Sequence, residues 1–186
     1  MLKQTKFVAD SDLIKEWDWE ENNKLNLNPY LLTIASHKKV HWVCKKGHKW
    51  IASINHRGIG ETKCPYCSNK KVLVGFNDFE SQFPELMKEW NWEENNKIKI
   101  FPNEIFWGSG KKVHWICSNG HKWITSIRHR TLRGTNCPYC SNKKILSGYN
   151  DLKSQRPDLM KEWDYEKNIL DPEKVAILSP KKAYWI

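Results

Sequence analysis

Two groups of cysteine and histidine residues have spacings suited to binding a metal ion. Both groups follow the pattern C-x3-H-x15-C-x2-C. Three thiolates and one imidazole form a complete tetrahedral ligand set, which is typical of structural zinc sites and leaves no coordination position for water. The sequence therefore predicts two structural Zn²⁺ ions per chain. The predicted ligands are Cys44, His48, Cys64 and Cys67 in the first group, and Cys117, His121, Cys137 and Cys140 in the second.

Disulfide bonds and ordinary buried cysteines are the alternatives to metal binding. Three cysteines cannot all pair within one group, and the same spacing occurs twice, so neither alternative is favoured. His56 and His129, which both precede an arginine, are alternative fourth ligands. We favour His48 and His121, because a short turn containing glycine returns them to the neighbourhood of the first cysteine of each group.

The two groups belong to an internal repeat. The segment LIKEWDWEENNK at Leu13 returns as LMKEWNWEENNK at Leu86, and CPYCSNKK occurs at Cys64 and again at Cys137, with the same offset of 73 residues. A third copy begins with LMKEWDYEKN at Leu159. We predict zinc module one at residues 1–80, zinc module two at residues 81–153 and an incomplete third module at residues 154–186.

The third module lacks its metal ligands. Its last residues, KKAYWI, correspond to KKVHWI in module two, where the next residue is Cys117. We interpret the third copy as a truncated module. A terminal cap that covers module two is the alternative, because repeat arrays often end in an atypical unit.

A β-hairpin is expected to position the first two ligands of each module. The segments KKVHWVC and KWIASI alternate as strands do, and KKGH supplies the turn between them. Upstream, Leu13, Ile14 and Trp17 have helical spacing, and Pro84 and Pro157 suit the first turn of the next two helices. Each module is thus expected to be a small α+β zinc-stabilised unit, with a short helix and a zinc-ribbon or treble-clef-like hairpin. A module of this size needs its metal, because its core is small.

Tryptophan is expected to supply much of that core. The chain contains 11 Trp, against 6 Phe and 6 Tyr. Trp17 and Trp19 cannot share one helical face, so we expect one of them at the helix end. The strand tryptophans alternate with other apolar residues, which favours core packing over stacking on exposed nucleobases. They are Trp42, Trp50, Trp115 and Trp123.

Positive charge is concentrated around the predicted zinc ligands. The formal net charge is +10, and the stretch from Lys38 to Lys71 holds nine basic residues and one acid, while Lys111 to Lys144 holds eight and none. A clustered basic surface is typical of nucleic-acid-binding proteins, although an ordinary solvated face is the alternative. The candidate phosphate contacts are Lys45, Lys46, Lys49, Arg57, Lys70 and Lys71 in module one, and Lys122, Arg128, Arg130, Arg133, Lys143 and Lys144 in module two.

These segments resemble a known family. The stretches EWDWEEN, KKVHWVCKKGHKWIASINHR, CPYCSNKK and GFNDF are similar to the zinc-ribbon or treble-clef-like repeat domain found in tandem in bacterial and large-virus proteins. The resemblance covers nearly the whole chain, and its ligands fall on the eight residues named above. It implies zinc binding and, because some members carry a nuclease-like domain beside the repeats, association with DNA. A nuclease-like partner or a further C-terminal domain is implied in the same way.

We expect a non-enzymatic zinc-binding repeat protein that binds nucleic acid, DNA rather than RNA, as a recognition or anchoring module. A protein-interaction scaffold with purely structural zinc, whose basic face docks an acidic partner, is the first alternative. Part of a nuclease is the second, but the zinc sites are predicted to be full and no nearby carboxylate recurs in both modules. No apolar run suits a signal peptide or a membrane span, so we expect a cytoplasmic protein without membrane association.

Overall fold

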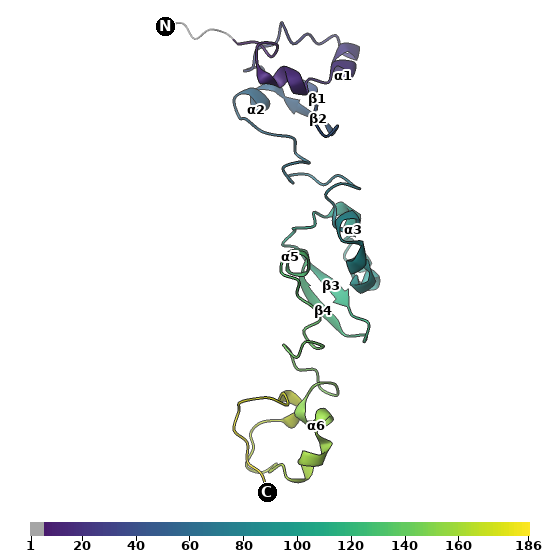
Figure 1. Ribbon diagram of the computed structural model, residues 1–186, viewed down its shortest axis with the longest axis vertical. Helices are drawn as coiled ribbons and strands as arrows, with labels where there is room; N and C mark the ends of the chain where they lie inside the picture. Colours follow the sequence, from purple (N-terminus) through teal and green to yellow (C-terminus); the bar gives the residue numbers. More distant parts are fainter. Residues whose placement is uncertain (1–5) are drawn as a thin grey trace, which may run out of the picture. The chain divides into compact units, whose positions relative to one another are not determined.

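The computed structural model describes residues 6–186 of the chain. The chain divides into two compact units, Met1–Asn77 and Asp78–Ile186 (Figure 1). The first unit contains the first copy of the repeat, and the second unit contains the second and third copies. Two-stranded hairpins with short helices confirm the predicted α+β class, whereas the boundaries of the three predicted modules stay a prediction. Within residues 6–186, no helix has both the length and the apolar character needed to cross a bilayer.

Two short helices replace the single helix expected around Trp17. The first, η1 (Asp12–Glu16), is a 3₁₀-helix, and the second, α1 (Trp19–Lys24), is an α-helix. The Asp18 carboxylate between them accepts a hydrogen bond of 3.2 Å from the backbone N–H of Glu21. An N-cap residue has an extended backbone, so the chain must leave the first helix before the second can begin.

This break decides which tryptophan of each pair enters the core. Trp17 is 2% exposed, whereas Trp19 is 46% exposed. The second unit repeats the arrangement, with Trp90 at 1% and Trp92 at 45%. The helical spacing predicted that the two tryptophans of a pair do not share one face. In the structure, the first tryptophan of each pair is buried and the second is exposed to solvent.

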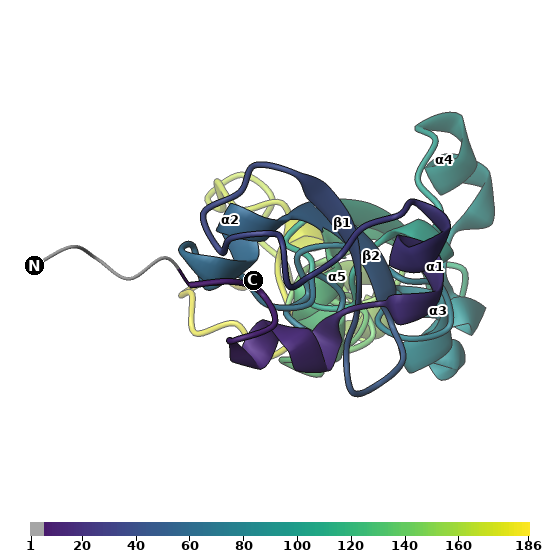
Figure 2. The ribbon, with the colours of Figure 1, turned by 90° about the horizontal axis from the view of Figure 1, so that it is seen from above.

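The expected antiparallel hairpin is formed by β1 (Lys39–Val43) and β2 (Lys49–Ser53). The turn between them contains Gly47, whose φ of +79° is a conformation that glycine adopts at little cost, as predicted. The helix α2 (Ile54–Gly58) follows β2 directly. Figure 2 shows this hairpin and its flanking helices from a second direction.

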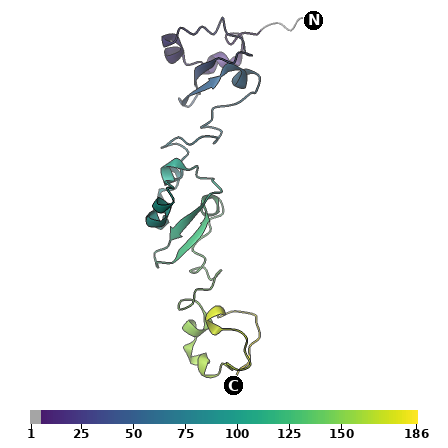
Figure 3. The same cartoon turned by 180° about the vertical axis from the view of Figure 1, so that it is seen from behind.

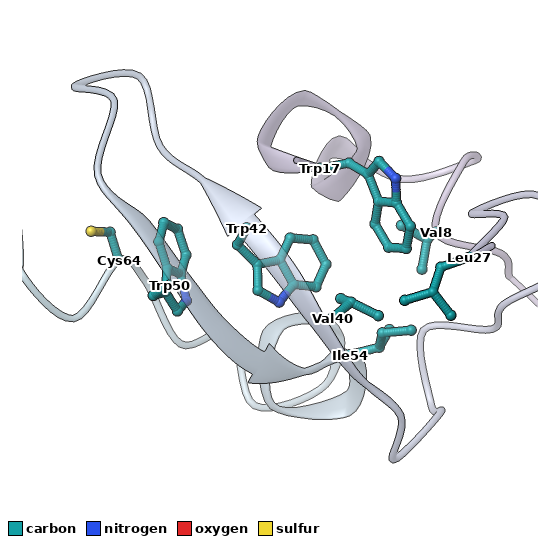
Figure 4. Close-up of a cluster of buried hydrophobic side chains, with 8 residues drawn as sticks. All are labelled: Val8, Trp17, Leu27, Val40, Trp42, Trp50, Ile54 and Cys64. Atoms are coloured by element: carbon teal, nitrogen blue, oxygen red, sulfur yellow. The ribbon is translucent and has the colours of Figure 1, made fainter. Parts of the chain in front are cut away.

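Tryptophans from three different segments meet in the core of the first unit (Figure 4). The rings of Trp17 and Trp42 pack edge to face with centroids 5.8 Å apart. Trp42 lies directly opposite Trp50 in the strand register, and both are buried, which confirms core packing for the strand tryptophans. Cys64 belongs to the same cluster and lies at its Trp50 end, so the second ligand pair is attached to the core. The whole cluster consists of Val8, Trp17, Leu27, Val40, Trp42, Trp50, Ile54 and Cys64.

A buried asparagine joins α1 to β1. The side-chain amide of Asn22 donates a hydrogen bond of 2.8 Å to the carbonyl of His41 and accepts one of 2.9 Å from its N–H. Asn95 makes the same pair of bonds with His114 in the second unit. Each asparagine side chain thus hydrogen-bonds to the backbone N–H and carbonyl on the outer edge of the first hairpin strand, as the backbone of a neighbouring strand would. These bonds attach the helix to the hairpin.

The second unit repeats the design of the first. Trp90 packs edge to face on Trp115 at 5.7 Å, and Pro84 occupies the first turn of its helix as predicted. Figure 3 shows the hairpin and helices of this unit from behind. The elements of the second copy of the repeat are α3 (Phe79–Gln82), η2 (Pro84–Glu89), α4 (Trp92–Lys97), η3 (Pro102–Glu104), β3 (Lys112–Ile116), β4 (Lys122–Ser126) and α5 (Ile127–Thr131).

The third copy repeats the helical part of the design. A β-bridge joins Trp163 to Trp185, as another joins Trp90 to Trp115 in the preceding copy. Trp185 is nevertheless 45% exposed, whereas Trp115 is fully buried. The difference arises because, within the described part of the chain, no second strand or ligand loop covers Trp185. The elements of this copy are α6 (Leu152–Gln155), η4 (Pro157–Lys161) and η5 (Pro172–Lys174).

Candidate metal centres

Four ligand side chains converge at one end of the first hairpin. Cys44 directly follows β1 and His48 directly precedes β2, while Cys64 and Cys67 come from the CPYC loop. The Sγ atoms of Cys44 and Cys67 are 3.8 Å apart. The Nδ1 atom of His48 lies 3.7 Å from the sulfur of Cys64 and 3.2 Å from that of Cys67. All four donor atoms lie within 4.8 Å of one another.

The geometry of these donors fits a tetrahedral zinc ion. Zn–S bonds of about 2.3 Å and Zn–N bonds of about 2.0–2.1 Å at tetrahedral angles require sulfur atoms about 3.8 Å apart and sulfur–nitrogen pairs about 3.6 Å apart. The sulfur pair Cys44–Cys67 meets the first requirement, and the contact between Cys64 and His48 meets the second to within about 0.1 Å, whereas the contact between Cys67 and His48, at 3.2 Å, is about 0.4 Å too short. Three sulfurs and one nitrogen are also the donors that zinc prefers in structural sites.

The second unit repeats this centre. The sulfurs of Cys117 and Cys140 are 3.8 Å apart, and Nδ1 of His121 lies 3.7 Å from Cys137 and 3.3 Å from Cys140. These distances match those of the first centre, and all four donors again lie within 4.8 Å of one another. The chain therefore has two Cys3His sites suited to two zinc ions.

Backbone hydrogen bonds help to position the ligands. The N–H of Cys44 donates to the carbonyl of His48 at 3.1 Å, which closes the hairpin tip. In the CPYC loop, the backbone N–H of Ser68 donates to the carbonyl of Cys64 at 3.0 Å, and that of Lys70 donates to Pro65 at 2.8 Å. The loop therefore turns sharply and directs both of its cysteines towards the hairpin.

Residues beyond the ligands hold each CPYC loop in place. The Asn77 side chain accepts a hydrogen bond of 2.7 Å from the N–H of Leu73 and donates to the carbonyls of Tyr66 and Lys71 at 3.1 and 3.0 Å. Asn150 makes the equivalent bonds in the second unit. These asparagines were not among the predicted site residues, although the recurrence of GFND and GYND after each CPYC pair marks them.

Aromatic rings cover the ligand histidines. The rings of His48 and Phe76 have centroids 4.1 Å apart, and His121 and Tyr149 are equally close. This packing restricts the rotation of each imidazole and keeps Nδ1 directed at the sulfurs. Supporting groups of this kind orient metal ligands and tune their affinity. Phe76 and Tyr149 were also missed, and they precede the two asparagines in the same recurring segment.

The thiols in each cluster have divergent pKa values. Burial raises the pKa of Cys137 to about 11. Burial also raises the pKa of Cys140, but hydrogen bonds with His121 and the neighbouring thiols outweigh it and lower this pKa to about 7. In the first unit, burial and hydrogen bonds with the other thiols raise the pKa of Cys67 to about 11, whereas backbone N–H donors lower that of Cys44 despite burial. Zinc binding would therefore have to displace protons from the less acidic thiols.

The alternative histidines lie outside both clusters. Nδ1 of His129 lies 3.3 Å from Oγ1 of Thr125. Neither His129 nor His56 belongs to a group of converging donor atoms in the part of the chain that the structure describes. The converging donors include His48 in the first unit and His121 in the second, and each of these histidines directly follows the glycine of its turn.

Most of the candidate phosphate contacts are exposed and have no carboxylate partner among the described residues. Lys49 is an exception, since it forms salt bridges of 3.3 Å with both Asp18 and Glu20. We call the exposed group without such partners the basic surface. Its members are Lys45, Lys46, Lys70, Lys71, Lys122, Arg128, Arg133, Lys143 and Lys144.

Two predicted phosphate contacts have a different place in the structure. Arg57 and Arg130 are only 7% and 4% exposed. Arg57 forms a salt bridge with Glu16, and its guanidinium carbon lies 5.4 Å from the ring centre of Trp42. Arg130 forms the equivalent bridge with Glu89 at 2.7 Å. Because their charges are paired within the fold, we leave both arginines out of the basic surface.

Comparison with known proteins agrees with this geometry. The model of the family described as "Probable Treble clef zinc finger domain" matches residues 13–70 and again residues 86–143, together more than half of the chain. Each match contains one complete set of four converging ligands. A search of curated protein sequences returned no match. On this match and the two metal centres, the chain belongs to the treble clef zinc finger family as a tandem repeat of its zinc-binding domain.

Proposed function

We propose that the chain binds nucleic acid through the basic surface, as a non-enzymatic recognition or anchoring module. The proposal rests on one observation: among the described residues, the lysines of the helical parts form salt bridges, whereas the lysines beside the CPYC loops do not. Lysines of the helical parts, such as Lys24 and Lys97, each form salt bridges with two glutamates. Within residues 6–186, the lysines beside the CPYC loops form none, so their charge is available to a polyanion.

The zinc centres support this role by placing the lysines. In the second unit, the backbone N–H groups of Lys143 and Lys144 both donate to the carbonyl of Pro138, at 2.8 and 2.9 Å. Lys70 and Lys71 are held by Pro65 in the same way. The turn that directs two thiols at the metal therefore also fixes two cationic residues on the surface. Such residues neutralise phosphates and release counterions, whatever the base sequence.

The zinc ions themselves have a structural role in this proposal. Each centre has four protein donors, whereas a catalytic zinc needs a position for water or substrate. Cysteines that serve as metal ligands and not as disulfide partners are best preserved in a reducing compartment, which supports a cytoplasmic location. DNA is favoured over RNA only by the nuclease-like domains that accompany similar repeats.

The salt dependence of binding tests the proposal. Fluorescence anisotropy of the zinc-loaded chain with labelled duplex and single-stranded DNA, measured between 50 and 200 mM salt, should show a steep loss of affinity. The double variant Lys70→Ala/Lys143→Ala should bind more weakly and with a salt slope about two units shallower, because each lost phosphate contact removes about one. The matched control, Lys24→Ala/Lys97→Ala, removes the same charge from paired lysines and should leave the slope unchanged.

A protein scaffold with an acidic partner makes the opposite prediction. A scaffold of this kind should not bind DNA or RNA at about 100 mM salt, because charges separated by more than a Debye length are then largely screened. Equal effects of the two double variants would also contradict the proposal, since net charge alone would then explain the attraction.

A further inference from the structure

The second unit contains a cationic hollow beside β4. It has a volume of about 260 Å³. Trp123, Ile124 and Pro138 supply apolar walls, and Ile124 is 56% exposed. Arg133, Lys143 and Lys144 supply the positive charge, and these residues come from two different loops. The remaining lining residues are Thr125, His129, Thr135 and Asn136.

No acidic residue lines this hollow in the described structure. The larger hollow of the first unit, of about 530 Å³, differs because Asp12, Glu16 and Glu61 line it together with its lysines. Those carboxylates would repel a phosphate and compete for the cations. The hollow beside β4 therefore suits an anion much better than the larger hollow does.

The loops that carry the cations are fixed by hydrogen bonds. The N–H and the hydroxyl of Thr135 both donate to the carbonyl of His129, at 3.1 and 2.8 Å, and the guanidinium of Arg130 donates to the carbonyl of Thr135. Lys143 and Lys144 are held by the carbonyl of Pro138, as described above. A ligand would thus need to order side chains only, which lowers the entropic cost of binding.

We propose that this hollow binds a phosphate group of a phosphodiester chain. The three cations would contact the phosphate oxygens, and Ile124 and Trp123 would contact the adjoining sugar or base edge. An apolar wall beside a cationic rim favours a nucleotide over a bare inorganic anion. This inference rests on the proposed function and narrows it, because it assigns one phosphate contact to this hollow of the second unit.

The sequence of the first unit suggests a pair of substitutions that tests this site. At the positions of Arg133 and Gly134 it has Gly60 and Glu61. The backbone is the same, because Thr62 also donates twice to the carbonyl of the α2 histidine, at 3.0 and 2.8 Å. Glu61 has a φ of +47° and Gly134 one of +58°, so the left-handed turn accepts either residue. The swap therefore removes one cation that lines the hollow and adds a carboxylate at the next residue, without a new backbone conformation.

The experiment compares the zinc-loaded full chain with Arg133→Gly/Gly134→Glu. We expect this variant to bind a short single-stranded oligonucleotide about tenfold more weakly at about 100 mM salt, with a salt slope shallower by about one or more. The control Lys88→Glu makes the same change in net charge at an exposed position of η2 and should alter affinity less than about twofold at that salt concentration. Circular dichroism and a zinc count establish that both variants fold.

Nuclear magnetic resonance titrations of the full chain locate the ligand and identify its source. A thymidine dinucleotide should shift the amides of residues 133–136 and 143–144 at lower concentration than inorganic phosphate or pyrophosphate does. Equal or stronger shifts with the inorganic anions would overturn a phosphodiester ligand. If the swap binds like the wild type while Lys45→Ala/Lys70→Ala, which replaces two exposed lysines of the first unit, weakens binding, the hollow is not the contact and the proposed function stands. If no nucleic acid binds at all, both proposals fall.

Discussion

Arg57 and Arg130 show that the type of a residue does not decide its role. Both were candidate phosphate contacts because they lie in strongly basic segments. In the structure each lies over two tryptophan rings, at distances of 5.1–5.7 Å, and pairs with a glutamate from η1 or η2. These partners are about 40 residues away in the sequence, so local composition could not reveal them.

Replacing Arg57 by lysine should destabilise the first unit without changing the salt dependence of DNA binding. Lysine keeps the charge but has no planar guanidinium to pack over the rings of Trp42 and Trp50, so we expect a loss of about 1–2 kcal/mol in the free energy of unfolding. Chemical denaturation checks this value. The exposed Arg128→Lys serves as the control and should change it by less than about 0.5 kcal/mol. A wild-type stability for the Arg57 variant would show that the cation is not part of the core.

The thiol pKa values predict a pH dependence for zinc binding. In the metal-free second centre, Cys137 has a pKa of about 11 and is protonated at pH 8, whereas Cys140, with a pKa of about 7, is mostly ionised. Zinc binds cysteines as thiolates, so protons compete with the metal for the same sulfur atoms. The stability that zinc supplies is therefore present at neutral and higher pH and is lost as the pH falls and protons displace the metal.

Calorimetry in two buffers of different ionisation enthalpy measures the protons released. At pH 8 we expect at least one proton per zinc bound, and a weaker apparent affinity at pH 6. An affinity that does not depend on pH would mean that thiolates are not the ligands.

At the scale of elements, the sequence predicted the hairpins and missed the helix break. Strand alternation and the turn glycine were sufficient for β1–β2 and β3–β4, because both signals are local. The division between η1 and α1 depends on Asp18, whose carboxylate caps α1. The pattern of an aspartate followed by Glu21 three residues later is a helix-start signal that the spacing of apolar residues concealed.

The asparagine link between helix and hairpin is open to a direct test. Asn22→Ala would leave the N–H of His41 without its partner and its carbonyl with only the longer bond of 3.3 Å from the N–H of Asp18, so we expect a loss of about 1–3 kcal/mol in the free energy of unfolding. The neighbouring Asn23 is exposed, and Asn23→Ala should have little effect. Similar thermal melts for the two variants would show that the link does not hold the helix in place.

At the scale of the whole molecule, the two zinc-bearing cores share no residue. The ligand spacing was sufficient to predict both clusters, since tetrahedral coordination fixes which donors must meet. The supporting residues Asn77 and Phe76, and their counterparts in the second unit, could not be predicted in this way. Their roles depend on how the chain returns to the CPYC loop, which no spacing rule describes.

Separate cores predict separate responses to the loss of one ligand. Cys64→Ser should reduce the zinc content from two ions to one and abolish the dispersed resonances of the first unit, while those of the second unit remain. Cys137→Ser should have the reverse effect. Heteronuclear NMR with native mass spectrometry measures both. Loss of both zinc ions in either variant would contradict two independent centres.

The zinc content of the purified chain, measured together with its thermal melt before and after chelation, tests the central claim most directly. The structure predicts two zinc ions per chain and a cooperative melt that is lost when a strong chelator removes them, because a structural zinc can contribute on the order of 10 kcal/mol to folding. A chain that contains no zinc and melts at the same temperature with or without chelator would contradict it.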